Sequence, residues 1–249
     1  MTDFTMQKGD DGVAVITWDV SGKSMNVLSF DGAGELDRLM DDALADDAVK
    51  GIVITSGKDD FAGGMDLNAI ADMKDAGGAQ GVFDGVMSLH ALLRKIERAG
   101  MDPKTLKGGK PVAAALTGTA LGIGLELPLA THRVFAADNP KAKIGLPEIM
   151  VGIFPGAGGT TRLVRKLGAM QAAPLLLEGK LSDPKGAKSA GIIDEVVATV
   201  TDWPGFAARR EADAGRGLLR GFGITVLCWL LGTTFAMALG LLIALVQRY

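Results

Sequence analysis

Two segments of the chain repeat one order of elements: a short apolar run, a glycine-containing turn and the start of a helix. The runs at 51–55 and 112–116 predict buried strands, and glycine turns at 62–67 and 122–127 follow them. Other apolar patterns predict further strands and helices, at 13–18 and 133–137 for strands and at 35–45, 82–98, 122–130, 160–167, 170–178 and from 184 for helices. Strands that alternate with helices indicate an α/β domain with mainly parallel pairing.

Two carboxylates stand alone in apolar surroundings. Glu126 is the only charged residue within 111–131, and Glu148 is the only one within 144–161. Burying a carboxylate without a partner costs several kcal/mol or forces it to hold a proton. Since each lies beside a glycine-rich turn, the pair indicates an acid/base site in a pocket. Helix starts offer free N–H groups, so two that converge there would hold an oxyanion.

The composition excludes several functional classes. The net charge is -3, and no basic block stands beside aromatic residues in the first two hundred positions, which argues against a nucleic-acid partner. One cysteine, Cys228, excludes an internal disulfide framework, and two distant histidines, His90 and His132, indicate structural roles and no metal centre. The acidic N-terminus lacks the pattern of a signal peptide, so the N-terminal domain is expected in the cytoplasm.

The C-terminal region has a different composition. Residues 222–246 carry no charge over 25 positions, and a bilayer core needs about 20 apolar residues in a helix. The pattern predicts one transmembrane helix, with a buried core helix as the alternative. The expected domains are 1–200, a basic juxtamembrane linker at 201–221 and the span at 222–246. Four arginines precede the span and one follows it, which predicts a single-pass protein of the cell inner membrane with its large domain cytoplasmic.

Small residues recur every fourth position within the predicted span. Gly232, Ala236 and Gly240 form a small-xxx-small face, which permits close approach of another helix. Small residues are also common in membrane helices, so the pattern leaves a docking face and an ordinary span as alternatives. The expected partners are the lipid bilayer and either a second copy of the chain in a homo-oligomer or a membrane complex.

Three motifs resemble those of the enoyl-CoA hydratase/isomerase (crotonase) family, in particular the hydratase half of bacterial multifunctional fatty-acid oxidation enzymes. They are Phe-Ala-Gly-Gly-Met-Asp-Leu at 61–67, Gly-Thr-Ala-Leu-Gly-Ile-Gly-Leu-Glu-Leu at 118–127 and the segment 145–160. The resemblance covers about residues 10–198. It implies a crotonase-like spiral of ββα repeats, followed here by the single C-terminal transmembrane helix.

The resemblance also implies a reaction and a site. An acyl-CoA thioester carbonyl would lie between the backbone N–H groups of Met65 and Ile123, which stabilise the enolate. Glu126 is expected to orient the water that adds at C3, and Glu148 to deliver the proton at C2. Coenzyme A is part of the substrate, and neither a cofactor nor a metal is expected. Further substrate contacts are expected from six residues, some through the backbone: Asn26, Ala62, Gly64, Asp66, Leu67 and Gly122.

The sequence departs from the family pattern at three places. Ile123 replaces the middle glycine of the usual Gly-Gly-Gly, and its β-branched side chain is expected to restrict the backbone or crowd the thioester. The lysines of the loop 98–110 either meet CoA phosphates or face solvent. Beyond 198 the basic linker and span stand in place of a helical module that covers the acyl pocket. These departures leave an alternative function: a non-catalytic accessory subunit docked into a membrane complex by its span.

Overall fold

The computed structural model describes residues 2–105 and 107–198 of the 249-residue chain, without the side chains of 67 and 70–76. The predicted linker at 201–221 and the predicted span at 222–246 both lie outside the described residues. Among the helices that the structure describes, none combines the length and the apolar character needed to cross a bilayer.

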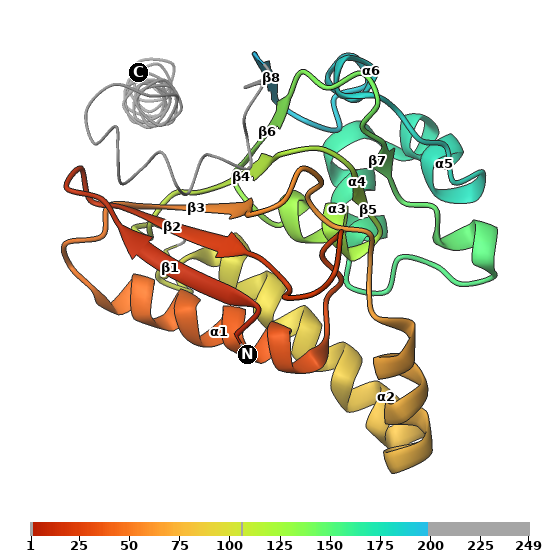
Figure 1. The fold of residues 1–249 in the computed structure, drawn as a ribbon, viewed down its shortest axis with the longest axis horizontal. Helices are drawn as coiled ribbons and strands as arrows, with labels where there is room; N and C mark the ends of the chain where they lie inside the picture. The colour runs from red at the N-terminus through yellow and green to blue at the C-terminus, as the bar shows by residue number, and fades with distance from the viewer. Residues whose placement is uncertain (1, 106, 199–249) are drawn as a thin grey trace, which may run out of the picture. The chain divides into compact units, whose positions relative to one another are not determined.

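The domain is built on a six-stranded sheet with the strand order β1-β2-β3-β4-β6-β8 (Figure 1). Its strands are β1 (Phe4–Lys8), β2 (Val13–Trp18), β3 (Gly51–Ser56), β4 (Val112–Leu116), β6 (Arg133–Ala137) and β8 (Glu195–Val197). Only β1 pairs antiparallel in this sheet, and each of the other pairings is parallel. The expectation of mainly parallel pairing is confirmed. Two short strands, β5 (Ala120–Leu121) and β7 (Ile144–Gly145), form a separate parallel pair.

Burial explains which strands could be predicted from the sequence. Every residue of β3 and β4 is buried, as expected for parallel strands covered on both faces, and both read as continuous apolar runs. The strands predicted at 13–18, 112–116 and 133–137 match β2, β4 and β6 residue for residue. The polar edge strand β1 and the short strands β5, β7 and β8 were not predicted, because they lack a long apolar run.

The helices follow the predicted order with shifted starts. They are α1 (Phe30–Ala45), α2 (Leu67–Arg98), α3 (Ile123–Leu129), α4 (Gly159–Leu167), α5 (Ala169–Leu177) and α6 (Pro184–Ser189), with a 3-10 turn η1 (Glu148–Val151). Helix α1 begins five residues earlier than predicted, since the Ser29 hydroxyl accepts a hydrogen bond from the Gly32 N–H and caps it. Helix α2 begins fifteen residues early and breaks at Gly78, where φ is 57°.

The helices occupy two regions of the fold. Figure 1 shows α1 and α2 along one side of the sheet, whereas α3 lies beyond the arrowheads of β2 and β3. Buried side chains of α1 and α2, such as Leu36, Met40 and Leu93, join the main apolar core. Because parallel strands end at the same edge, the turns that follow β3 and β4 come together near α3.

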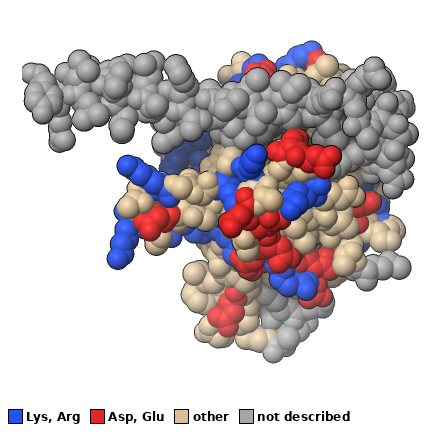
Figure 2. Space-filling model, turned by 90° about the vertical axis from the view of Figure 1, so that its left-hand side faces the viewer, with Lys and Arg blue, Asp and Glu red and all other residues tan. Residues whose placement is uncertain are grey.

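The lysine-containing loop before β4 lies at the opposite end of the parallel strands from those turns. Lys110 donates hydrogen bonds to the carbonyls of Ala43 and Asp46, at 2.9 and 2.6 Å, and so caps the last turn of α1. Lys104 and Lys107 are exposed. On the face drawn in Figure 2, basic and acidic side chains lie side by side. Lys110 therefore stabilises the end of α1, Lys104 and Lys107 face solvent, and a contact of these lysines with CoA phosphates stays a prediction.

Candidate active site

The two glycine turns predicted from the sequence run side by side. Ala62 and Ala120 form a parallel bridge, and the Leu121 N–H donates to the Ala62 carbonyl at 2.9 Å. Met65 and Ile123 lie three residues beyond this bridge on their own segments, so they hold equivalent positions. None of the described residues accepts a hydrogen bond from the backbone N–H of either one. Two free donors at matched positions are suited to hold one oxygen.

The Gly-Ile-Gly sequence at 122–124 fits its surroundings tightly. Gly122 has φ 56°, which favours glycine, and a Cβ there would lie 3.4 Å from Glu148 Oε1. A Cβ on Gly124 would lie 2.7 Å from the Ala62 carbonyl oxygen. Ile123 between them is 4% exposed and packs in the apolar core. The middle position of this sequence therefore has room for a side chain within the fold, and crowding of a thioester by Ile123 stays a prediction, since Ile123 also lines the cavity.

The turns open onto an apolar cavity of about 390 Å³. Gly64, Met65, Gly122 and Ile123 line it, and so do both isolated carboxyl groups. Apolar side chains from four parts of the fold complete the wall: Phe30, Val82, Val86, Leu89, Met150, Val151, Ile153 and Phe154. Such a wall suits an apolar ligand that carries a few polar atoms at one end.

Glu126 is held rigidly in this wall. It extends from α3, is 3% exposed, and its Oε1 accepts hydrogen bonds from the N–H groups of Ala157 at 3.0 Å and Gly159 at 2.7 Å. Burial raises the pKa of Glu126 to about 7, although the bond from Gly159 opposes the rise; the nearby charge of Glu148 raises it further. A carboxyl group with a pKa near neutrality exchanges protons readily at physiological pH.

The donors to Glu126 come from the glycine run that precedes α4. This run forms a tight turn that starts the helix, with Gly158 at φ 101° before α4. Its role as a clamp on Glu126 was missed. A Cβ on Gly159 would lie 2.6 Å from Glu126 Cγ, so this position has no room for a side chain. The sequence feature that could have indicated this contact is the glycine at the first position of α4, Gly159.

Glu148 is placed differently. It begins η1, and its Oε2 is buried without a hydrogen-bond partner among the described residues. Burial raises its pKa above the ordinary value. The structure thus brings both predicted carboxyl groups to one cavity, together with Met65 and Ile123.

Asn26 lies apart from the cavity wall. Its side chain is fully buried, donating to the Trp18 and Phe61 carbonyls and to the Ser56 hydroxyl, and accepting from the Val20 N–H. Its own carbonyl accepts from the Gly63 N–H at 2.8 Å. The amide is fully used within the protein, so Asn26 supports the first glycine turn from behind and its side chain has no donor left for a substrate.

Of the other residues predicted to contact the substrate, Gly64 and Gly122 line the cavity, whereas Ala62 and Asp66 do not. Ala62 is buried in the bridge to Ala120. Asp66 caps α2 by accepting from the Asn68 N–H and pairs with Lys23 at 3.0 Å, and this bond to Lys23 lowers its pKa. Leu67 begins α2, and its side chain is outside the described part.

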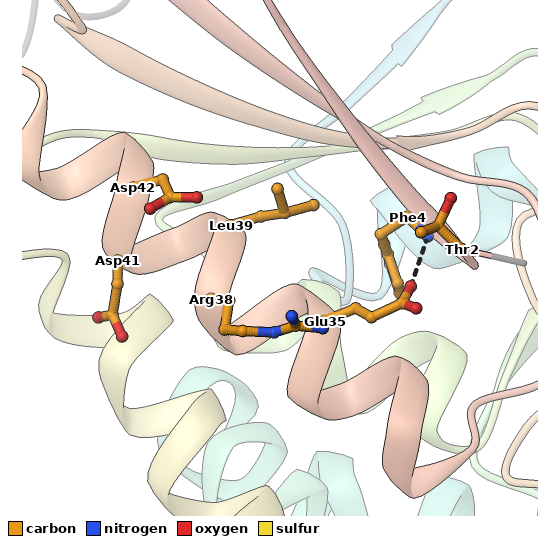
Figure 3. Close-up of a pocket in the computed structure, with 7 residues that line it drawn as sticks. All are labelled: Thr2, Phe4, Glu35, Arg38, Leu39, Asp41 and Asp42. Carbon is orange, nitrogen blue, oxygen red and sulfur yellow. Dashed lines mark hydrogen bonds between the residues drawn. The ribbon is translucent and has the colours of Figure 1, made fainter.

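A second cavity, of about 340 Å³, lies between α1 and the N-terminal strand. Its Glu35 carboxylate accepts from the backbone N–H groups of Asp3 at 2.7 Å and Phe4 at 3.2 Å, the latter drawn in Figure 3. Arg38 donates to the Gly34 carbonyl, and Asp41 pairs with Lys95. These polar groups are engaged in holding β1 and α1. Among the side chains that the structure describes, no cluster is suited to hold a metal ion.

Known proteins are similar to this chain in sequence and in fold. The chain is 42% identical over 195 residues to the fatty acid oxidation complex subunit alpha of Idiomarina loihiensis, and 36% identical over 197 residues to that of Shewanella amazonensis. Both matches cover 78% of this chain but 26% of the relative, so the chain spans about a quarter of the length of these relatives.

Solved structures agree with the sequence matches. An enoyl-CoA hydratase from Geobacillus kaustophilus superposes with a TM-score of 0.69 at 26% identity, covering 86% of this chain and 74% of that one. The enoyl-CoA hydratase of Bacillus anthracis gives the same TM-score and identity, covering 87% and 78%. Residues 8–202 match the family model described as enoyl-CoA hydratase/isomerase. The chain has the crotonase-like α/β fold and belongs to the enoyl-CoA hydratase/isomerase family.

Proposed function

We propose that this protein hydrates 2-enoyl-CoA thioesters in fatty-acid oxidation, adding water across the 2,3 double bond. The observation that carries the proposal is the meeting of two carboxyl groups and two free backbone N–H groups on one apolar cavity. Hydration of a conjugated thioester needs both sets of groups: donors for the oxygen that gains charge, and acids or bases for the two protons that move.

The thioester oxygen is assigned to the N–H groups of Met65 and Ile123. When water attacks C3, negative charge moves onto this oxygen as an enolate, and two fixed donors stabilise it most when the charge has developed. Both donors belong to the backbone of packed segments, so they need no rearrangement during the reaction. The acyl chain then extends along the apolar wall.

The two carboxyl groups receive different tasks. Glu126 is fixed by Ala157 and Gly159, which suits it to orient the attacking water and to take its proton as the oxygen bonds to C3. Glu148 has an oxygen without a partner and a raised pKa, which suits it to hold the proton that goes to C2. One water is consumed per turnover: its hydroxyl bonds to C3, its proton stays on Glu126, and Glu148 gives one proton to C2. The site is restored when the proton on Glu126 passes through solvent to Glu148, so that both carboxyl groups regain their starting states.

The proposal is tested with crotonyl-CoA, whose conjugated double bond loses its absorbance on hydration. We expect turnover by the wild-type protein and a fall in kcat of about 100-fold or more in E126Q and in E148Q, the size of a lost acid/base group. The matched control is E178Q, the same change at an exposed position at the end of α5. Wild-type turnover in either site variant contradicts the assignment, and a 3-enoyl-CoA substrate separates hydration from isomerisation.

The oligomeric state and the membrane attachment of the protein are proposed from the sequence. We propose a homo-oligomer that needs no cofactor and is tethered to the inner membrane by residues 222–246, with this domain cytoplasmic. Fractionation of cells that express the full chain tests the tether: recovery in the wash with alkaline carbonate contradicts it. Absence of both turnover and CoA binding in the intact, detergent-solubilised protein would favour the accessory-subunit alternative.

A further inference from the structure

His90 lies on α2, on the far side of the loop that holds Glu126. Its Nε2 is 2.7 Å from the carbonyl oxygen of Gly156. A carbonyl only accepts, so this ring nitrogen carries the hydrogen and donates. His90 does not line the apolar cavity of the proposed substrate, and the sequence pattern indicates a structural role for it.

The peptide that His90 binds is also the peptide that binds Glu126. The Gly156 carbonyl and the Ala157 N–H belong to one planar peptide group. His90 donates to its oxygen, and its N–H donates to Glu126 Oε1 at 3.0 Å. A donor at the oxygen polarises the group and strengthens the hydrogen bond that its N–H makes. Histidine and glutamate are therefore connected through a single peptide unit.

A second residue holds the same loop from α4. Arg162 donates from Nη1 to the Ala157 carbonyl at 3.2 Å and pairs with Glu97 at 3.3 Å. The charged groups that line the cavity around His90 are Arg94, Glu97, Arg162 and Arg165. Arg162 is shared between the loop and Glu97, whereas His90 makes its hydrogen bond to the peptide that faces Glu126.

We propose that His90 is a positioning residue for Glu126, acting through the Gly156–Ala157 peptide. Its hydrogen bond fixes the orientation of this peptide and strengthens the N–H that binds the Glu126 carboxylate. The inference rests on the proposed function only because that function assigns Glu126 to orient the attacking water. The geometry of the connection stands by itself.

A defined change in Glu126 follows from this connection. The Ala157 N–H favours the charged carboxylate, so weakening it raises the pKa of Glu126. Glu148 acts in the same direction from η1, and Arg162 opposes it from α4; both stay in place when His90 is replaced. Loss of the His90 donor is therefore expected to move the Glu126 titration toward higher pH.

The experiment is a titration of the intact protein labelled with carbon-13 at the glutamate carboxyl carbon, with E126Q to assign the signal. H90F removes the donor and keeps a ring, while H90Q keeps a side-chain N–H. We expect the Glu126 midpoint to rise by roughly one pH unit in H90F, a common size of environmental effect, and to stay near wild type in H90Q. If H90F does not fold, H90L replaces it, with thermal unfolding as the check on folding.

The outcomes separate the inference from the proposed function. The same Glu126 midpoint in the donor-free variant as in wild type overturns the inference, whether or not the protein hydrates crotonyl-CoA. A higher midpoint with rescue in H90Q supports it, even if wild type shows no turnover. With an active enzyme, kcat at about pH 6 is expected to fall about tenfold in H90F with KM unchanged, because below both pKa values a rise of one unit lowers the ionised fraction of Glu126 about tenfold.

Discussion

Two helical segments, α3 and η1, each place a glutamate in the wall of the apolar cavity, and the two carboxyl groups have different surroundings. On α3, Glu126 is almost wholly buried and its carboxyl oxygen is bound by two backbone N–H groups. On η1, Glu148 has a buried oxygen without a partner, and its neighbours Met150 and Val151 are 72% and 70% exposed. Burial is thus the largest cause of the raised pKa of both groups, whereas of the two only Glu126 is held in place by backbone N–H groups.

The largest expected effect comes from replacing each carboxyl group with an apolar chain of similar shape. At pH 5, E126M strands two buried N–H donors and should lower the free energy of unfolding by about 2–4 kcal/mol. E148M removes a carboxyl oxygen that has no partner and should raise it by up to about 1 kcal/mol. Denaturant unfolding at pH 5 measures both. A similar loss in the two variants contradicts the contrast.

The second expected effect is a pH dependence of stability. The pKa of Glu126 is raised from 4.5 to about 7 in the folded protein, so between these values the native state binds more protons than the unfolded state. Stability from this group is present below pH 4.5 and is lost as pH rises through 7. The variant E126Q keeps an acceptor but no charge, so its unfolding free energy should gain on wild type by about 3 kcal/mol between pH 4.5 and 8. Parallel curves for the two proteins contradict the prediction.

A smaller effect is expected from crowding the clamp on Glu126. In G159A the new methyl group would lie 2.6 Å from Glu126 Cγ, which should cost about 1–3 kcal/mol of stability and reduce hydration. The control is G34A on α1, where a Cβ meets nothing within 4 Å. Because alanine favours a helix over glycine, G34A should stabilise the fold by roughly 0.5–1 kcal/mol. Thermal unfolding and crotonyl-CoA turnover measure both, and equal results would refute the tight fit.

The smallest effect is expected on the side of Glu148. Met150 is 72% exposed, so M150S should change the free energy of unfolding by less than about 0.5 kcal/mol. The same method measures it. A loss above about 1 kcal/mol would show that η1 is held as firmly as the clamp on Glu126.

Sequence reasoning reached the parts of the fold whose cause is local. Apolar runs identified β2, β4 and β6, and the isolated charges identified Glu126 and Glu148. The start of α1 was missed because Gly32 and Gly34 in its first turns are poor helix formers. The clamp was missed because it joins Glu126 to backbone N–H groups 31 and 33 residues later, which side-chain identity does not reveal.

Long-range contacts also explain the reassignment of Asn26. Its amide unites Trp18, Ser56 and Phe61, and no pattern within a short stretch of sequence reveals such a junction. The cavity wall shows the same limit. Phe30, Val86 and Phe154 come from separate parts of the chain and meet only in the folded state.

The bridge between Ala62 and Ala120 has a consequence for how this site changes over evolution. Because the two proposed oxygen-binding groups are main-chain amides placed by strand pairing, another apolar side chain of similar size at 65 or 123 would leave them in position, whereas Gly122 and Gly124 are fixed by a positive φ and by contact with Ala62. The positions of the two proposed oxygen-binding amides thus depend on the register of strand pairing more than on which side chains stand at 65 and 123. An insertion or deletion between either strand and its turn would displace these amides, even if every recognisable residue survived.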